Sequence, residues 1–353
     1  MRRARIGVAN IICLLAACAR ESANLSHAHS TKVRLGRRLG LMNDISVAYI
    51  IFNRPRHTRE TFAAIRAQRP PRLFLIADGP RAGHPTDAQR CRETREIVEQ
   101  IDWPCEIHRN YADQNMGLKR RISSGLDWVF SQVESAIILE DDCLPNADFF
   151  VFCETLLERY KDDERVWTVT GNNYQNGRRR GSGSYYFSKY GHCWGWATWR
   201  RAWQQFSPDL SFWTAWKGSE DWCRKSPDPL EQIYWADIFD RIHANKIDSW
   251  AYPWMATLWY HGGLTATPRV NLVTNIGIGP DGTHTIADED QPGTPVKPLG
   301  VITHPDSVER NAEADQYIFD NLLGGRYQKF PLKYLKFPIR VRNKLVRMWK
   351  GKP

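Results

Sequence analysis

The sequence lacks the features that define several large classes of protein. Its 353 residues contain no run of about eighteen apolar residues, so no transmembrane helix of ordinary length is expected. None of the eight cysteines stands in a C-x-x-C pair, which argues against a zinc ribbon or a thioredoxin-like site. No Walker loop and no G-x-S-x-G elbow is present, so P-loop and hydrolase chemistry have no support. Reduced thiols in a cytoplasmic protein are the simplest expectation.

Acidic residues are scarce at both ends of the chain. The net charge is +10, to which residues 326–353 contribute +10 and residues 1–41 contribute +7, leaving −7 for residues 42–325. An acidic body is a poor partner for a polyanion, so nucleic-acid binding is not expected. The basic tail 326–353 suits peripheral contact with an anionic membrane surface; a solvated tail is the alternative.

Residues 1–41 form an extension that we do not expect to belong to the fold. Met1–Arg5 and Ile6–Ala17 resemble the charged and apolar regions of a signal peptide, and Leu15–Cys18 fits a lipobox. Alternatively, translation starts at Met42 and the upstream residues are a mis-started extension. The second interpretation is preferred, because the chemistry argued below needs a cytoplasmic substrate.

Residues 42–145 alternate short apolar runs with amphipathic stretches. The runs predict strands at 46–52, 72–77, 105–110 and 135–139, and the stretches predict helices at 58–66, 86–100 and 118–132. This alternation predicts an α/β fold with a mainly parallel sheet, flanking helices and a ligand site at the carboxyl ends of the strands. Three predicted strands end in polar or turn-forming residues: Asn53-Arg54-Pro55, Asp78-Gly79-Pro80 and Glu140-Asp141-Asp142.

The second half of the chain is rich in tryptophan. Eleven of the fifteen tryptophans fall between Trp194 and Trp259. Aromatic faces stack on sugar rings, so we expect residues 146–325 to form a half that binds a sugar-containing molecule. We call it the acceptor half. The alternative is a tryptophan-rich core, although packing alone rarely recruits so many. The acceptor-binding candidates are Trp194, Trp196, Trp250 and Trp254.

The most specific signal is three adjacent carboxylates, Glu140-Asp141-Asp142, directly after an apolar strand. Adjacent carboxylates repel one another, and burying them costs free energy unless a cation neutralises them. Mg²⁺ and Mn²⁺ prefer hard oxygen ligands and often use one or two carboxylates together with substrate phosphates. The pattern therefore indicates a divalent metal site; an acidic turn at a strand end is the alternative.

With its strand-plus-acidic element, the chain resembles glycosyltransferases of the GT-A fold. The acidic segment is similar to that of the N-acetylglucosaminyltransferase that begins complex N-glycans. The resemblance is closer to bacterial family 2-like glycosyltransferases, some described as haemolysin-type proteins, and it covers about residues 42–325. Further matching segments occur in order along the chain: Phe52–Pro55, Ala77–Pro80, Asn115–Gly117, Gly191–Trp199, Asp248–Trp254 and Asn275–His284.

The resemblance implies a nucleotide-sugar half at 42–145 and a role for individual residues. Asp142 would bind the metal, and His284 would be a second ligand, unless it is an ordinary loop histidine. Asp141 would meet the ribose or the sugar. The remaining donor-binding candidates are Arg54 and Asp78 near the base and ribose, Asn115 and Gly117 near the donor sugar and phosphates, and Lys119 or Arg120 to meet the phosphate charge.

The resemblance does not identify the catalytic base. The eukaryotic relative carries its base in a Trp-Asp-Asp-Trp segment, whereas the matching segment here, Trp213–Trp216, has no acid. Asp248 ranks first among the substitutes because an aromatic stretch follows it; capping the next helix is its alternative role. The other substitutes are Asp221 and Glu220.

The sequence thus predicts a glycosyltransferase that uses Mn²⁺ or Mg²⁺ and transfers a sugar, with inversion, from a nucleotide-sugar donor. The acceptor would be a hydroxyl of a surface glycan or a lipid-linked glycan. A nucleotidyltransferase is one rival, although it normally carries a glycine-rich loop after the first strand, which Asn53–His57 lacks. The other rival is a non-catalytic, carbohydrate-binding or membrane-active protein.

Overall fold

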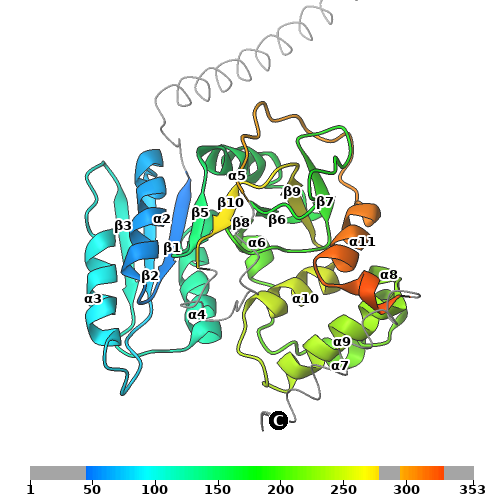
Figure 1. Cartoon of the computed structure of the whole chain (residues 1–353), viewed down its shortest axis with the longest axis horizontal. Helices are drawn as coiled ribbons and strands as arrows, with labels where there is room; N and C mark the ends of the chain where they lie inside the picture. The colour runs from blue at the N-terminus through cyan, green and yellow to red at the C-terminus, as the bar shows by residue number, and fades with distance from the viewer. Residues whose placement is uncertain (1–44, 278–294, 330–353) are drawn as a thin grey trace, which may run out of the picture.

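An eight-stranded sheet runs through the part of the chain that the computed structural model describes, residues 45–277 and 295–329 (Figure 1). A two-stranded ladder of β5 and β10 lies beside it. The strands are β1 Ser46–Ile51, β2 Arg72–Ala77, β3 Glu106–Tyr111, β4 Ser135–Glu140, β5 Cys143–Pro145, β6 Val166–Thr170, β7 Tyr185–Ser188, β8 Trp196–Trp199, β9 Leu264–Pro268 and β10 Val273–Asn275.

The sheet is mainly parallel, with the strand order β3-β2-β1-β4-β8-β6-β9-β7. β1 to β4 run parallel to one another, while β8 is inserted antiparallel between β4 and β6. β6 and β9 are parallel, and β7 closes the edge in the opposite direction. This is the expected fold class: a GT-A-like α/β fold with a mainly parallel sheet and flanking helices.

Helices cover both faces of the sheet. They are α2 Pro55–Gln68, α3 Asp87–Val98, α4 Leu118–Phe130, α5 Ala147–Arg159, α6 Arg200–Trp203, α7 Trp213–Trp216, α8 Glu220–Lys225, α9 Pro229–His243, α10 Ala251–His261 and α11 Ala312–Asn321, followed by a 3₁₀ turn, η1 Gly325–Gln328. Alternate residues of each strand point to opposite faces. Val47 and Tyr49 of β1 therefore pack with α2 and α5, whereas Ala48 and Ile50 pack with α4 and α10.

The predicted elements of the first half correspond closely to those observed. β2 occupies the predicted residues 72–77, and β1, β3 and β4 differ from their predicted ranges by a residue or two. α2 begins earlier than predicted, at Pro55, because proline at the first helical position needs no backbone hydrogen bond. No helix in the described part of the chain is long and apolar enough to cross a membrane.

Most of the tryptophans form a core, which was the alternative to a ligand-facing role. Ten of the eleven between residues 194 and 259 are buried, and Trp194 is the partly exposed one. Nine of the ten belong to one cluster on one face of the sheet, in which Trp196 contacts Trp203, Trp250 and Trp254, whereas Trp199 packs on the other face. Helices α6 to α8 are short and have little apolar surface to bury. Large aromatic side chains therefore provide the apolar contacts that hold these helices against the rest of the protein.

We expect Trp254→Ala to destabilise the protein by about 3–5 kcal/mol, the usual cost of emptying a large aromatic site in a core. Trp254 is 1% exposed and contacts Trp167, Trp203 and Phe206. The midpoint of urea unfolding measures the loss. Trp194→Ala is the matched control and should cost much less; equal losses would contradict the assignment of Trp254 to the core.

Candidate active site

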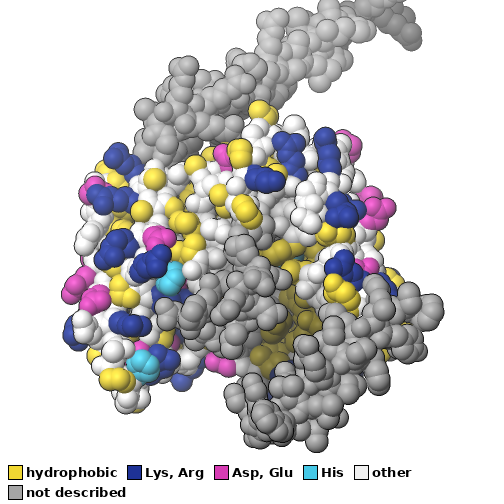
Figure 2. All heavy atoms as spheres, viewed as in Figure 1, with side chains coloured by type: hydrophobic (Ala, Val, Ile, Leu, Met, Phe, Trp, Pro, Cys, Tyr) yellow, Lys and Arg dark blue, Asp and Glu magenta, His cyan; other side chains and the backbone are white. Residues whose placement is uncertain are grey.

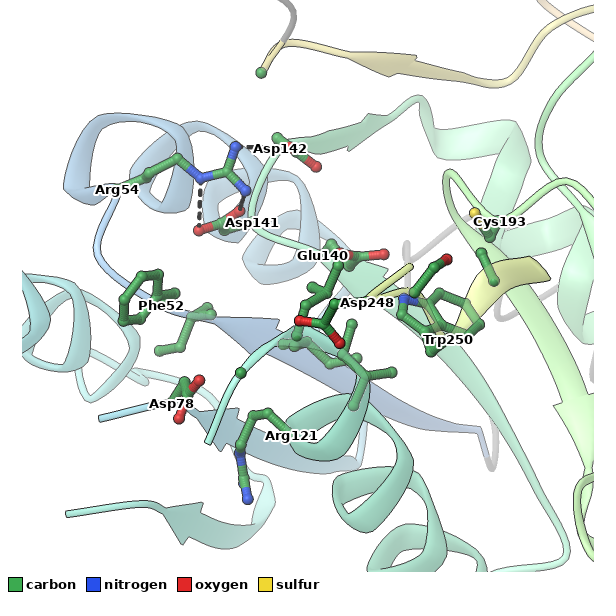
Figure 3. Close-up of a pocket in the computed structure, with 18 of the residues that line it drawn as sticks. Phe52, Arg54, Asp78, Arg121, Glu140, Asp141, Asp142, Cys193, Asp248 and Trp250 are labelled. Carbon is green, nitrogen blue, oxygen red and sulfur yellow. Dashed lines mark hydrogen bonds and ion pairs between the residues drawn. The ribbon is translucent and has the colours of Figure 1, made fainter. Parts of the chain in front are cut away.

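A cavity of about 600 Å³ opens where β1, β2 and β4 end (Figure 3). Ile50 of β1 lies beside both Ile76 of β2 and Glu140 of β4, so the three strands end at the same level. The three polar strand exits therefore converge, as the parallel sheet predicts. The lining residues come from these exits, from the start of α4, from 193–194, from 247–252, and from Asn275 and Gly277.

Arg54 bridges two carboxylates of the acidic triplet. Its Nη2 lies 2.7 Å from Asp141 Oδ1, and its Nη1 lies 2.8 Å from Asp142 Oδ2. Arg54 directly precedes α2, so Pro55 at the start of the helix fixes where its side chain leaves the backbone. Figure 3 shows the guanidinium between the two Asp side chains, with Glu140 farther into the cavity.

The triplet is short of positive charge. Burial, followed by the charges of Asp142 and Asp141, raises the pKa of the Glu140 carboxyl to about 8. Burial also raises the pKa of Asp141, although Arg54 opposes this shift. Among the described residues, none donates a hydrogen bond to the Glu140 carboxylate. One arginine thus faces three carboxyl groups, and the cluster can accommodate further positive charge.

The backbone of Gly277 lies directly against this ion pair. Ile276 donates its N–H to Asp142 O at 2.8 Å, and Gly277 donates its N–H to Asn275 Oδ1. A Cβ on Gly277 would overlap Asp142 Oδ2 and lie 2.8 Å from Arg54 Nη1. Only glycine therefore allows the chain after β10 to reach the acidic triplet.

Asp78 organises the loops at the opposite end of the cavity. It is 6% exposed and accepts hydrogen bonds from the N–H groups of Gly79 at 2.8 Å and Met116 at 2.9 Å. Asn115 Nδ2 donates to its second oxygen at 2.9 Å. Asp78, Asn115 and Gly117 therefore form one wall of the cavity, with Gly117 at a positive φ (+80°), which favours glycine, just before α4.

Phe52 and Arg81 line the same cavity and were not predicted from the sequence. The Arg81 guanidinium lies 5.5 Å from the centre of the Phe52 ring. Buried Asp87 fixes Arg81 through contacts of 2.6 Å to Nε and 3.0 Å to Nη2, and Asn53 donates to the same carboxylate. The arginine also holds the pKa of Asp87 well below its ordinary value. Phe52 lies in the Phe52–Pro55 segment that matches the glycosyltransferases, and this match could have indicated Phe52 as a site residue.

Asp248 lies at the cavity, and the other two candidate bases do not. Its Oδ1 accepts the backbone N–H of Lys119 at 3.3 Å, in the first turn of α4. It does not cap α10, whose N-cap is Trp250. Asp221 lies on α8, where it accepts from Trp216 Nε1 and pairs with Arg224; neither it nor Glu220 on the same helix lines the cavity.

The aromatic candidates divide between the cavity and the core. Trp194 and Trp250 line the cavity, whereas Trp196 and Trp254 are each 1% exposed and do not. Tyr252, 37% exposed, lines it as well and was not predicted, although it belongs to the Asp248–Trp254 segment. The Lys119 side chain is not part of the lining; its backbone N–H reaches Asp248.

Several predictions lie outside the described residues. These are His284 as a metal ligand, the extension 1–41 and all but the first four residues of the basic tail. Lys329, the last described residue, pairs with Asp228 and Asp320 on the body.

The residues at 45–277 and 295–329 contain no group of three or more His, Cys, Asp or Glu side chains arranged to hold a metal ion. Figure 2 shows Lys and Arg scattered among Asp and Glu over the N-terminal half of this face.

Fold and cavity together define an α/β protein with a polar site at the carboxyl ends of parallel strands, and the comparisons with known proteins name no family for it. No protein-family model matches the chain, and no curated protein sequence does. A mannosyltransferase from Pyrobaculum calidifontis in complex with GDP-Man and Mn²⁺ is 14% identical with a TM-score of 0.31, covering 53% of this chain and 56% of its own.

Two other solved structures show similarly low scores. A 4-diphosphocytidyl-2C-methyl-D-erythritol synthase from Anaerococcus prevotii is 8% identical with a TM-score of 0.33, covering 64% of this chain and 88% of its own. A UDP-glucose pyrophosphorylase complexed with UDP-glucose is 12% identical with a TM-score of 0.22, covering 39% and 65%. These values are too low to assign a family or an activity.

Proposed function

We propose that the chain is a glycosyltransferase that moves a sugar from a nucleotide-sugar donor to a hydroxyl of a glycan or glycolipid acceptor, with inversion. One observation carries the proposal: an acidic triplet and a separate carboxylate, Asp248, line the same cavity at the carboxyl ends of parallel strands. The triplet suits a metal-bound diphosphate, and Asp248 suits an acceptor hydroxyl. The partly exposed rings that line this cavity, Trp194 and Tyr252, provide ring faces for the acceptor.

The donor set fits Mn²⁺ or Mg²⁺. Asp142 Oδ1 contacts only the thiol of Cys143 at 3.5 Å among the described groups, and the Glu140 carboxylate accepts no hydrogen bond from them. Carboxylate oxygens are the ligands that these ions prefer, and a site with one or two of them is completed by phosphate oxygens and water. Asp142 would hold the ion, with Glu140 beside it, and His284 remains the proposed further ligand.

A cation is needed because the cavity is acidic. Its charged lining residues in the described chain are three arginines and five carboxylates: Arg54, Arg81, Arg121, Asp78, Glu140, Asp141, Asp142 and Asp248. A diphosphate entering without a cation would therefore meet more carboxyl groups than arginines. A bound divalent ion supplies the positive charge that stabilises the leaving diphosphate.

Residues of the chain then perform the remaining tasks. Asp248 takes the proton from the acceptor hydroxyl as that oxygen attacks the sugar. The Lys119 N–H, in the first turn of α4, holds this carboxylate in place. Asp78 and Asn115 keep the donor wall rigid through their mutual hydrogen bond, and Phe52 with Arg81 offers an aromatic and cationic surface for a nucleotide base.

The test is to supply purified protein with a panel of UDP-, GDP- and CDP-sugars, with Mn²⁺ and a hydroxyl acceptor. Release of a nucleoside diphosphate together with glycosylated acceptor is the expected result. Release of inorganic diphosphate from a nucleoside triphosphate would favour a nucleotidyltransferase, and binding without turnover a carbohydrate-binding protein. A nucleoside diphosphate at 100 times its dissociation constant should stabilise the protein by about 2.7 kcal/mol in a thermal-shift assay.

Gly277→Ala should weaken nucleoside diphosphate binding at least about tenfold. The added Cβ overlaps Asp142 and crowds Arg54, so either the ion pair or the backbone after β10 must move. Isothermal titration with the best nucleoside diphosphate and Mn²⁺ measures the change. Far-ultraviolet circular dichroism should be unchanged, because Gly277 lies outside the described helices and strands; unaltered affinity would show that the close approach has no role in binding.

A further inference from the structure

Arg54 holds its two carboxylate partners in different ways. It makes two contacts to Asp141, at 2.7 Å and 3.4 Å, and Asp141 also accepts the backbone N–H of Phe52. The Asp141 side chain is 3% exposed. Arg54 makes a single contact of 2.8 Å to Asp142, whose side chain is 15% exposed and lines the cavity. The first contact is anchored, and the second is the one that an entering ligand can replace.

Arg54 occupies the carboxylate that the proposed metal would use. Its Nη1 donates to Asp142 Oδ2, one of the two oxygens of the candidate ligand. A divalent cation that binds Asp142 through Oδ1 lies close to a guanidinium of the same sign, and one that takes both oxygens must also displace this donor. Both effects weaken the binding of a bare cation. A diphosphate that enters with the cation removes both penalties, because its oxygens carry negative charge and accept hydrogen bonds from Arg54.

We propose that Arg54 couples the binding of the divalent cation to that of the diphosphate, by pairing with Asp142 in the empty site and with the diphosphate in the occupied one. Its contacts to Asp141 keep the guanidinium in the site throughout, so only Nη1 changes partner. The proposal rests on the proposed function, since it concerns the metal and diphosphate of that site. It goes beyond that function in predicting that the two ligands bind cooperatively and that one residue is responsible.

Linkage makes the proposal quantitative. The factor by which diphosphate tightens the binding of Mn²⁺ must equal the factor by which Mn²⁺ tightens the binding of diphosphate. A purely structural arginine would act differently: its removal would leave a disordered site, and both ligands would bind more weakly. The affinity for Mn²⁺ alone and the coupling factor together separate the two roles, because only the coupling role predicts that the affinity increases while the coupling factor falls when Arg54 is neutralised.

The experiment measures three affinities by isothermal titration, using MnCl₂ and inorganic diphosphate as probes. MnCl₂ alone, diphosphate alone, and diphosphate in the presence of MnCl₂ are titrated into wild type, Arg54→Met and Arg54→Lys. Mn²⁺ and diphosphate also form a complex in solution. This complex affects the titrations of all the variants equally, so its contribution cancels when their affinities are compared. In Arg54→Met we expect Mn²⁺ alone to bind at least about tenfold more tightly and the coupling factor to fall by at least as much. Arg54→Lys keeps the charge and should keep Mn²⁺ affinity near that of wild type.

Arg109→Met is the control, because Arg109 pairs with Glu99 and does not line the cavity. It should leave the affinity for Mn²⁺ alone unchanged. If Arg54→Met does not fold, Arg54→Gln, which keeps hydrogen-bond donors without the charge, replaces it in the comparison with Arg54→Lys. Equal or weaker Mn²⁺ binding after neutralisation of Arg54 overturns the proposal, and so does Mn²⁺ binding to none of the proteins. Sugar transfer is assayed separately, so transfer without coupling would overturn this inference and leave the proposed function standing.

Discussion

Asp142→Asn is expected to reduce sugar transfer at least about a hundredfold while leaving the protein folded. The substitution keeps the size of the side chain and removes the negative charge that would hold the divalent ion. Losing an electrostatic element of this kind typically costs two to three orders of magnitude in turnover. Release of nucleoside diphosphate measures the rate. The fold should persist because one charge fewer relieves repulsion within the triplet, and Asp141 still anchors Arg54.

Asp162→Asn provides the control for this prediction. Asp162 is exposed in the turn between α5 and β6, away from the cavity, so the Asp162→Asn variant should be as active as wild type. In the wild-type enzyme, EDTA should abolish transfer and added Mn²⁺ should restore it. Full activity of Asp142→Asn, or full activity in EDTA, would remove Asp142 from the proposed metal site.

Asp248→Asn should reduce turnover by about a hundredfold to ten thousandfold, the range over which general base catalysis contributes. The amide oxygen can still accept the N–H of Lys119, which is now 3.3 Å from the carboxylate, so the local structure should persist. Nucleoside diphosphate binding, measured by thermal shift, should be close to that of wild type. A loss in turnover without a loss in donor binding identifies a group that acts on the acceptor.

Asp221→Asn distinguishes between the two candidate bases. Asp221 accepts from Trp216 and pairs with Arg224 on α8, outside the cavity lining, so this variant should retain turnover. The opposite pattern, with Asp221→Asn inactive and Asp248→Asn active, would show that the base approaches from α8 and that the proposed acceptor side is wrong.

Most helices and strands of residues 42–145 could be predicted because their sequence pattern is local. An apolar run bounded by turn residues predicts a buried strand, and strands that alternate with helices predict a parallel sheet. The carboxyl ends of such strands meet at one edge, so residues far apart in sequence could be placed together at Arg54, Asp78 and Glu140. The register of β1 with β2 and β4 places them at the same level.

The tryptophan-rich half could not be predicted in the same way. Composition does not show whether a tryptophan ring faces a sugar or another ring. Ten of the eleven tryptophans here are buried in the core. The choice depends on which segments pack together. α6 to α8 are four to six residues long and lack a helical repeat long enough to reveal their buried side.

The first four strands, the mainly parallel sheet and the position of the acidic triplet were predictable from the sequence, because burial of apolar side chains is encoded residue by residue. Two features became apparent only in the folded chain. Arg54 pairs with Asp141 and Asp142 of that triplet, across 87 and 88 positions, and Asp248 rather than Asp221 reaches the cavity, through a contact with Lys119 129 positions away. Contacts of this kind form between charged and polar groups whose partners are set by the packing of whole elements. Their energies depend on distance and burial, and neither quantity exists until the chain has folded.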